Sequence, residues 1–184
     1  MRKTVLYIAM SLDGYIADAA GGVAWLQGDG SQPGRETSYP AFFKTVDTVL
    51  LGYATYRQLV TVLSPDTWEY AGKTTYVFTH RKLESTDEIR FTDEDPAALV
   101  RRLREEPGKT IWVCGGASVV NPLIGADLID EYDVTVIPVV LGDGIPLFSK
   151  HPRSVPLRLV KTQTFDGMVG LLYERRPQPK RSGE

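Results

Sequence analysis

Hydrophobic and polar positions follow two different periods along the chain, and together these periods predict a succession of strands and helices. A continuous apolar run at residues 4–10 is typical of a strand buried on both faces. Segments rich in β-branched and aromatic residues predict further strands at 47–52, 73–79, 89–91 and 110–114. Apolar residues at helical spacing occupy residues 39–46, 53–62, 95–104 and 119–124. Strands are also predicted at residues 130–140, 157–165 and 168–176, and Asp166-Gly167 between the last two is a strong hairpin signal.

This order of elements predicts an α/β fold in three layers. Because strands alternate with helices up to residue 130 and dominate afterwards, we expect a mostly parallel central sheet with helices on both faces, ending in an antiparallel C-terminal hairpin. The 184 residues contain no repeat and no linker, so we expect a single domain over residues 1–176. Residues 177–184 are rich in Pro, Lys and Arg and are expected to form a disordered tail.

Charge and composition exclude several classes of partner. A formal net charge of −2 provides neither a basic field for nucleic acid nor a polybasic patch for a membrane. No apolar run approaches the roughly 18 residues of a membrane helix, and the first apolar stretch ends too early for a signal peptide. The single cysteine and two histidines allow no intramolecular disulfide and offer too few ligands for structural zinc. We therefore expect a cytoplasmic protein without a metal site.

The stretch around which the chain is organised is the predicted strand 110–114 with the glycine pair that follows it. A strand that ends on Gly115-Gly116 is typical of a place where something approaches the backbone closely. A helix begins near Ser118, and its free N–H groups and positive dipole end suit a phosphate or another anion. The alternative is an ordinary strand-to-helix turn.

Four other segments carry candidate chemistry, each with a structural alternative. Asp13 precedes Gly14, so its carboxylate either stabilises a turn or faces a pocket. The irregular, glycine-rich segment 18–38 is long enough to be a functional loop, in which Trp25 either packs on the core or forms a wall of a ligand site. Thr55 either caps a helix or binds a phosphate. Residues 79–82 (Thr-His-Arg-Lys) either hold a phosphate or form a solvated basic turn.

Five short motifs occur in one order along nearly the whole chain. They are Ile-Ala-Met-Ser-Leu-Asp-Gly-Tyr-Ile-Ala at 8–17, Gly-Val-Ala-Trp-Leu at 22–26, Leu-Leu-Gly-Tyr-Ala-Thr-Tyr at 50–56, Val-Cys-Gly-Gly-Ala-Ser at 113–118 and Leu-Gly-Asp-Gly-Ile-Pro-Leu-Phe at 141–148. In this order they resemble the dihydrofolate reductase superfamily. The resemblance is closest to the reductase domain of the bifunctional riboflavin-biosynthesis protein (the RibD C-terminal domain) and its stand-alone relatives. It implies the dihydrofolate-reductase-like fold, NADPH as cofactor and a homodimer built on the C-terminal strands.

The resemblance also assigns roles to particular residues. It implies that Ala9 and Ile16 flank the nicotinamide, that Gly52 and Thr55 lie on the pyrophosphate side, and that Thr79, His80 and Arg81 hold the 2′-phosphate end of the adenosine. It implies further that Gly115, Gly116, Ala117, Ser118 and Val119 present backbone N–H groups to the pyrophosphate, and that the Gly115–Gly116 peptide is cis. Trp25, Tyr39 and Phe43 are the expected walls of the substrate site.

Three departures from the family pattern change what is expected of the chemistry. Tyr39 lies where dihydrofolate reductases carry an acidic residue that binds the pterin, and a phenol with a pKa near 10 cannot form that ionic pair. Glu36, one turn earlier, is the nearest substitute. Tyr53 replaces a basic residue, so recognition of the 2′-phosphate falls on His80 and Arg81. The chain also lacks a zinc deaminase signature, and a ribose-phosphate substrate would need Arg35 or Arg57 in the pocket.

The sequence is therefore interpreted as an NADPH-dependent reductase that transfers a hydride to a small heterocyclic substrate, either pteridine-like or pyrimidine-like. Tyr39, or a water held by Asp13, is the candidate proton route. One alternative is a catalytically inactive nucleotide-binding module of the same fold. Another is a flavodoxin-like or Rossmann protein, against which the absence of Gly-x-Gly-x-x-Gly after the first strand argues.

Overall fold

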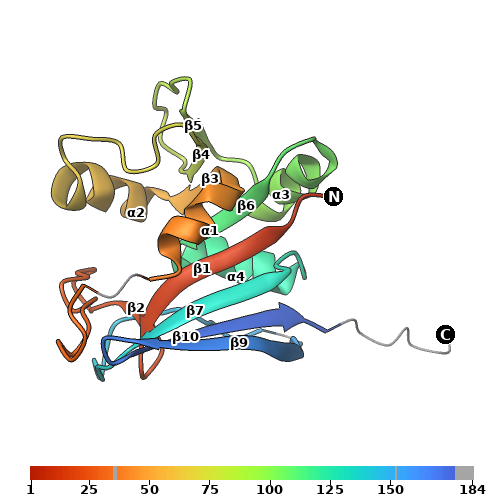
Figure 1. Cartoon of the computed structure of the whole chain (residues 1–184). Coiled ribbons are helices and arrows are strands. Elements are labelled where there is room, and N and C mark those ends of the chain that lie inside the picture. Colours follow the sequence, from red (N-terminus) through yellow and green to blue (C-terminus); the bar gives the residue numbers. More distant parts are fainter. Residues whose placement is uncertain (35–36, 152, 177–184) are drawn as a thin grey trace, which may run out of the picture.

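Eight strands form one sheet in the computed structural model, which describes residues 1–34, 37–151 and 153–176 (Figure 1). Neighbouring strands are parallel from β5 to β7, and the pairs β7–β10 and β10–β9 are antiparallel. The order across the sheet is β5 (Ile89–Thr92), β4 (Thr74–Phe78), β3 (Val46–Gly52), β6 (Thr110–Gly115), β1 (Thr4–Ser11), β7 (Glu131–Ile137), β10 (Met168–Arg175) and β9 (Leu157–Phe165). The mostly parallel sheet with a C-terminal antiparallel hairpin is confirmed.

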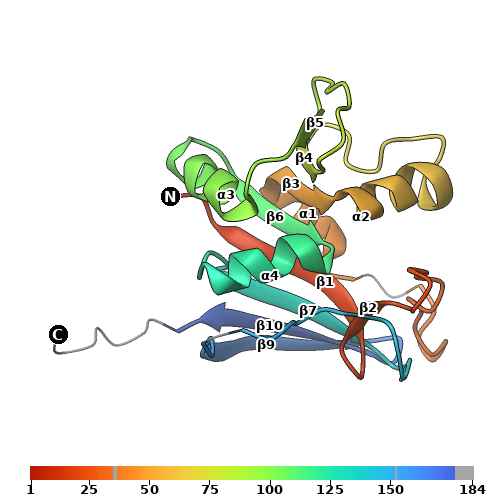
Figure 2. The same ribbon diagram turned by 180° about the vertical axis from the view of Figure 1, so that it is seen from behind.

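Helices cover both faces of this sheet, which gives the three predicted layers (Figures 1 and 2). One face carries α1 (Tyr39–Thr45), and the other carries α3 (Pro96–Glu105) and α4 (Ala117–Gly125). Successive strand residues point to opposite faces, so Leu6 and Val113 pack in the cluster under α3 and α4, whereas Trp112 packs in the cluster under α1. The Asp95 side chain caps α3 by accepting from the Ala98 N–H at 2.9 Å, as its position predicts.

The structure differs from the sequence-based expectation in four places. The helix expected over residues 53–62 is α2 (Tyr53–Gln58), which continues as a π-helical segment, η1 (Leu59–Leu63). The strand expected over residues 130–140 is shorter (β7), and Pro122 lies inside α4. A second, two-stranded sheet pairs β2 (Tyr15–Ala17) with β8 (Ile145–Pro146). These strands are too short to produce a hydrophobic pattern of their own.

The C-terminal hairpin turns at Asp166 and Gly167, as predicted. Both residues have positive φ angles, 50° and 73°, as a two-residue type I′ turn requires. The predicted tail 177–184, together with Arg35 and Glu36, lies outside the described residues. Within the described ranges, no helix is long and apolar enough to cross a bilayer.

Candidate active site

Three segments that the sequence singled out meet at the carboxyl ends of β3 and β6. Gly52 ends β3, Gly115 ends β6, and Gly116 is the N-cap of α4. A Cβ added to Gly52 would lie 3.4 Å from the Ser118 hydroxyl and 3.6 Å from the Gly116 nitrogen. A Cβ added to Gly116 would lie 3.6 Å from the Thr55 hydroxyl. These distances bring the backbone at the ends of β3 and β6 together with the hydroxyls of Thr55 and Ser118, at the strand ends where α/β proteins bind ligands.

The first turn of α4 provides N–H groups at this glycine cradle. Because α4 begins at Ala117, the N–H groups of Ala117 and Ser118 have no acceptor within the helix. The N–H of Val119 donates to the Gly116 carbonyl at 3.0 Å, and its side chain is buried in the core. This N–H is therefore not free for a phosphate. The Gly115–Gly116 peptide is cis.

Ile16 borders the cradle from the other side, and Ala9 lies on the strand that precedes it. Ala9 lies near the carboxyl end of β1, two residues beyond Tyr7, and both are partly exposed. The Ile16 Cδ1 atom lies 3.8 Å from the position of a Cβ on Gly116. The structure therefore brings Ile16 next to Gly116 and Thr55, which are distant from it in the sequence.

Arg81 lies against Tyr53 at the end of β4. Its guanidinium carbon is 5.0 Å from the centre of the Tyr53 ring, which lies at the start of α2. The Thr79 hydroxyl accepts from the Arg81 N–H at 3.1 Å, and the neighbouring His80 is exposed. A cation–π contact orients the guanidinium. Tyr53, which replaces the basic residue of the family pattern, therefore orients the guanidinium of Arg81, the cation predicted to bind the 2′-phosphate.

Tyr39 and Phe43 belong to an aromatic cluster under α1. Their ring centres lie 5.5 Å apart, and the Tyr39 ring lies 5.8 Å from Trp112 and 6.1 Å from Tyr7. Burial, with smaller contributions from Glu69, Cys114 and Tyr7, raises the pKa of Tyr39 to about 12. The phenol therefore stays protonated at neutral pH and can only donate or accept a hydrogen bond.

Trp25 is separate from that cluster. Its indole N–H donates to the Gly22 carbonyl at 3.1 Å, so the ring is fixed by its own loop. Among the described residues, no ring contact joins Trp25 to Tyr39 or Phe43. Its predicted place in a substrate wall stays a prediction.

Asp13 makes hydrogen bonds that account for its position in a turn. Its carboxylate accepts from the Ser11 hydroxyl at 2.6 Å and from the N–H groups of Leu141 and Gly142 at 3.1 and 2.8 Å. These bonds, led by that of Ser11, lower the pKa of Asp13. A carboxyl with a lowered pKa is a poor proton donor at neutral pH. Tyr39, with its pKa raised to about 12, releases its proton less readily than a free phenol, so neither pKa is matched to proton donation at neutral pH and both catalytic roles stay predictions.

A groove that the sequence did not reveal lies between α1 and the C-terminal part of the sheet. It has a volume of about 420 Å³, and Asp133 of β7 is among its lining residues. The sequence carried one signal for it, since residues 131, 133 and 135 are polar and alternate with apolar residues. Within the described ranges, no group of three or more His, Cys, Asp and Glu side chains could hold a metal ion.

Comparison with known proteins shows the family of this chain. The model of the RibD C-terminal domain matches residues 2–171. The uncharacterized protein YwjB of Bacillus subtilis (strain 168) is 47% identical over 178 residues, which cover 95% of this chain and 98% of the relative.

Two solved structures extend the comparison. A protein of Shewanella sp. PV-4, whose name assigns it provisionally to riboflavin biosynthesis, is 27% identical with a TM-score of 0.82, over 95% of this chain and 99% of that one. Dihydrofolate reductase from Enterococcus faecalis, solved in complex with NADP(H), is 19% identical with a TM-score of 0.62, over 95% and 97% of the two chains. At that identity the likeness shows the fold alone. The chain therefore belongs to the RibD C-terminal domain family and has the dihydrofolate-reductase-like fold.

Proposed function

We propose that the protein is an NADPH-dependent reductase that transfers a hydride to a small heterocyclic substrate of pteridine-like or pyrimidine-like type. The observation that carries the proposal is the glycine cradle, where Gly52 and Gly116 bring the ends of β3 and β6 to Thr55 and Ser118 beside the first turn of α4. Free N–H groups at a helix N-terminus are suited to a pyrophosphate, and a glycine allows the phosphate to approach the backbone. Bound there, NADPH supplies the hydride.

In this proposal, each of the other predicted cofactor residues binds one part of NADPH. Ala117 and Ser118 donate to the pyrophosphate, while Ala9 and Ile16 flank the nicotinamide. Arg81, supported by the Tyr53 ring, binds the 2′-phosphate together with Thr79 and His80. A guanidinium is well suited to a phosphate because it can donate two parallel hydrogen bonds.

The protein itself orients the nicotinamide and the substrate, and it supplies or relays one proton to the substrate. The substrate lies between the nicotinamide position at Ala9 and the aromatic residues of α1. Tyr39, protonated at neutral pH, is the candidate that donates or relays the proton. Holding the two reacting groups in this geometry and excluding water supply most of the acceleration.

Titration of the purified protein with NADPH and NADH tests the proposal. Because Arg81 would contact only the 2′-phosphate, Arg81→Ala is expected to weaken NADPH binding about tenfold or more and to leave NADH binding unchanged. Ser118→Ala is expected to weaken the binding of both nucleotides. Arg101→Ala, which removes an exposed cation on α3, is the control and is expected to change either affinity by less than about threefold.

Two outcomes separate the alternatives. If neither nucleotide binds at millimolar concentration, the cofactor assignment is wrong. NADPH binding without oxidation by any pteridine or pyrimidine in a substrate panel supports the second candidate, a nucleotide-binding module without catalysis. The observation that favours this candidate is the phenol of Tyr39 in place of a carboxylate on α1.

A further inference from the structure

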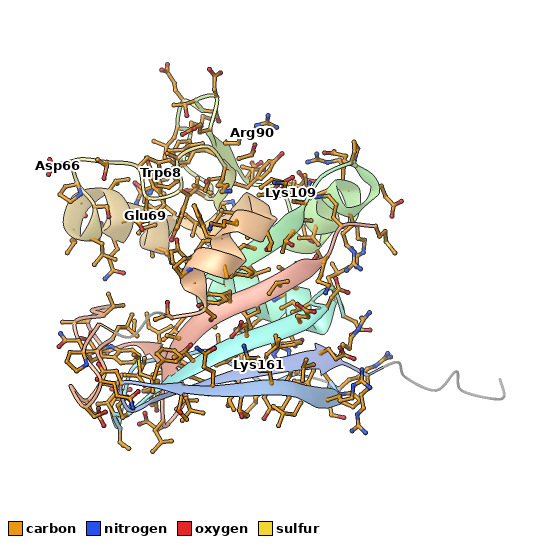
Figure 3. All side chains as sticks on the ribbon, viewed as in Figure 1. Asp66, Trp68, Glu69, Arg90, Lys109 and Lys161 are labelled. Atoms are coloured by element: carbon orange, nitrogen blue, oxygen red, sulfur yellow. The ribbon has the colours of Figure 1, made fainter. Side chains whose placement is uncertain are left out.

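A segment that carries no sequence motif, residues 64–73, lies next to the proposed substrate site. It follows η1, returns along α2 and leads into β4 (Figure 1). Figure 3 labels Trp68 and Glu69 of this segment beside α2. Tyr70 belongs to the buried cluster under α1, and Trp68 packs against that cluster. The segment therefore adds aromatic side chains to a wall for which the sequence predicted only residues 25, 39 and 43.

Tyr70 occupies the space between α1 and α2 on this face of the sheet. Its ring centre lies 6.4 Å from that of Phe43 on α1 and 5.0 Å from that of Trp112 on β6. On the α2 side, the Trp68 ring lies 5.4 Å from Tyr70 and 5.9 Å from Tyr56. Aromatic rings at these separations pack against each other. Because Tyr70 is also buried, its ring fills the space that the two helices leave between them.

The Tyr70 hydroxyl reaches the carboxyl end of β6. Its oxygen lies 3.4 Å from the sulfur of Cys114, which directly precedes Gly115 and Gly116 of the glycine cradle. Burial, and secondarily Cys114, raises the pKa of Tyr70. The hydroxyl therefore stays neutral, so Tyr70 takes up space beside the cradle without supplying a charge.

The turn that carries Tyr70 is tied to α1. The Lys73 N–H donates to the Tyr70 carbonyl at 3.1 Å, and Gly72 between them has a positive φ of 76°, which glycine adopts without strain. The Lys73 ammonium donates to the Val46 carbonyl at 2.7 Å and lies 4.6 Å from the centre of the Phe43 ring. A cation–π contact of this kind holds the turn against Phe43. The position of the Tyr70 ring is thus fixed relative to the predicted substrate wall.

Tyr70 and the predicted nicotinamide position lie over neighbouring strands on one face of the sheet. Tyr7 packs against the cluster that contains Tyr70, and Ala9, two residues further along β1, points to the same face. Cys114 lies on β6, which pairs with β1 on one side and with β3 on the other. A ring that lies beside Ala9 and extends away from β1 across β6 therefore meets Tyr70.

We propose that Tyr70 determines specificity by closing the substrate site on the α2 side, so that the substrate is a small heterocycle without a bulky substituent. This inference rests on the proposed reductase function and makes its substrate class narrower. A pteridine or pyrimidine that carries hydrogen or a methyl group on the edge facing Tyr70 fits beside the ring. A substituent the size of a benzyl group collides with it, because a close-packed interior has no room for an added ring.

Two pairs of ligands, each with one heterocycle and two sizes of substituent, test the inference on the unaltered full-length chain. The first pair is 6-methylpterin and folic acid, and the second is 6-aminouracil and 6-benzylaminouracil. Binding is measured by calorimetry in the presence of NADP⁺. We expect at least one of the two small ligands to bind, and its bulky partner to bind about tenfold more weakly or worse.

Two variants identify the residue responsible. Tyr70→Ala removes the ring and is expected to reduce the preference for the small ligand about tenfold, because the bulky partner can enter the space that the ring vacates. Tyr70→Phe is the matched control, because it keeps the ring and loses only the hydroxyl, and it is expected to change the preference less than about threefold. The preference is a ratio of two affinities for one protein, so a general loss of structure, which lowers both affinities, does not produce the expected result.

The inference is overturned if neither small ligand binds, if a bulky ligand binds as tightly as its small partner, or if Tyr70→Ala keeps the preference of the unaltered protein. NADPH binding combined with any of these results leaves the reductase proposal intact. Absence of nucleotide binding overturns the reductase proposal instead. If Tyr70→Ala does not fold, Tyr70→Leu takes its place with the same expected loss of preference, because leucine keeps an apolar contact and lacks the part of the side chain that reaches Cys114.

Discussion

At the scale of single residues, the partly buried carboxylate of Asp133 opposes folding stability at neutral pH. Asp133 is an acidic residue in the middle of a sheet, where burial raises its pKa to about 6, whereas an unfolded chain has a pKa near 3.9. The folded protein therefore holds this proton more tightly than the unfolded chain does. The corresponding stability is fully present below about pH 4 and is lost as the pH rises through about 6.

Asp133→Asn is accordingly expected to stabilise the protein at pH 7.5, by about 1 kcal/mol after solvent screening is considered, and to have little effect at pH 4. Urea unfolding at the two pH values measures the difference. Asp93→Asn, at an exposed carboxylate, is the control and is expected to change stability at neither pH. If Asp133→Asn raised the free energy of unfolding equally at both pH values, the stabilisation would come from packing and not from the loss of the charge.

The glycines at the ends of β3 and β6 were singled out from the sequence alone, because a strand that ends on glycine is typical of a close backbone approach. Their role in binding a cofactor stays a prediction. The roles of Asp13 and Asp133 could not be distinguished in this way. One carboxylate accepts three hydrogen bonds and the other accepts none among the described residues, and only neighbours distant in sequence decide this.

At the scale of elements, residues 28–32 of the glycine-rich segment contact the turn of the C-terminal hairpin. The Asp29 N–H donates to the Asp166 carbonyl at 3.0 Å, and the Gln32 N–H donates to the Asp166 carboxylate at 2.8 Å. Gly28 lies so close to Asp166 that an added Cβ would collide with its carbonyl and carboxylate oxygens. This part of the loop is thus held by a turn 134 residues away in the sequence.

Gly28→Ala is expected to displace this loop from the hairpin without unfolding the protein. The loop should then be cleaved several times faster in limited proteolysis, while the midpoint of thermal unfolding changes little. Gly125→Ala, where an added Cβ meets nothing within 4 Å, controls for the substitution itself. Unchanged cleavage of Gly28→Ala would mean that the contact with Asp166 does not hold the loop.

At the scale of the whole molecule, Arg2 joins the starts of three strands at the end of the sheet opposite the cradle. Its guanidinium is buried, forms an ion pair with Asp47, donates to the Thr48 hydroxyl at 2.6 Å and donates to the Lys109 carbonyl at 2.9 Å. These contacts connect β1 with the segments that begin β3 and β6. They contribute to assembly of the sheet and not to the candidate site.

Arg2→Ala is expected to lower the free energy of unfolding by about 2 kcal/mol, because it leaves Asp47 without its cation. The nucleotide affinity of the folded protein should not change. Arg158→Ala removes an exposed ion pair with Glu174 and is expected to cost less than about 0.5 kcal/mol. Denaturant unfolding and nucleotide titration of both variants measure these effects. A weakened nucleotide affinity in Arg2→Ala would show that the two ends of the sheet are coupled.

The sequence by itself determined the order of the main elements, the parallel sheet with its C-terminal hairpin, and the glycine pair at the candidate site. These features follow from local periodicity and from the backbone freedom of glycine, both of which can be read from neighbouring residues. Tertiary structure alone decided that Arg81 packs on the Tyr53 ring and that Asp133 faces a groove beside α1. It also decided that the Asp13 carboxylate accepts hydrogen bonds from the N–H groups of Leu141 and Gly142. The physical reason is that hydrogen bonding, burial and pKa depend on side chains from other strands, which only the folded sheet brings together.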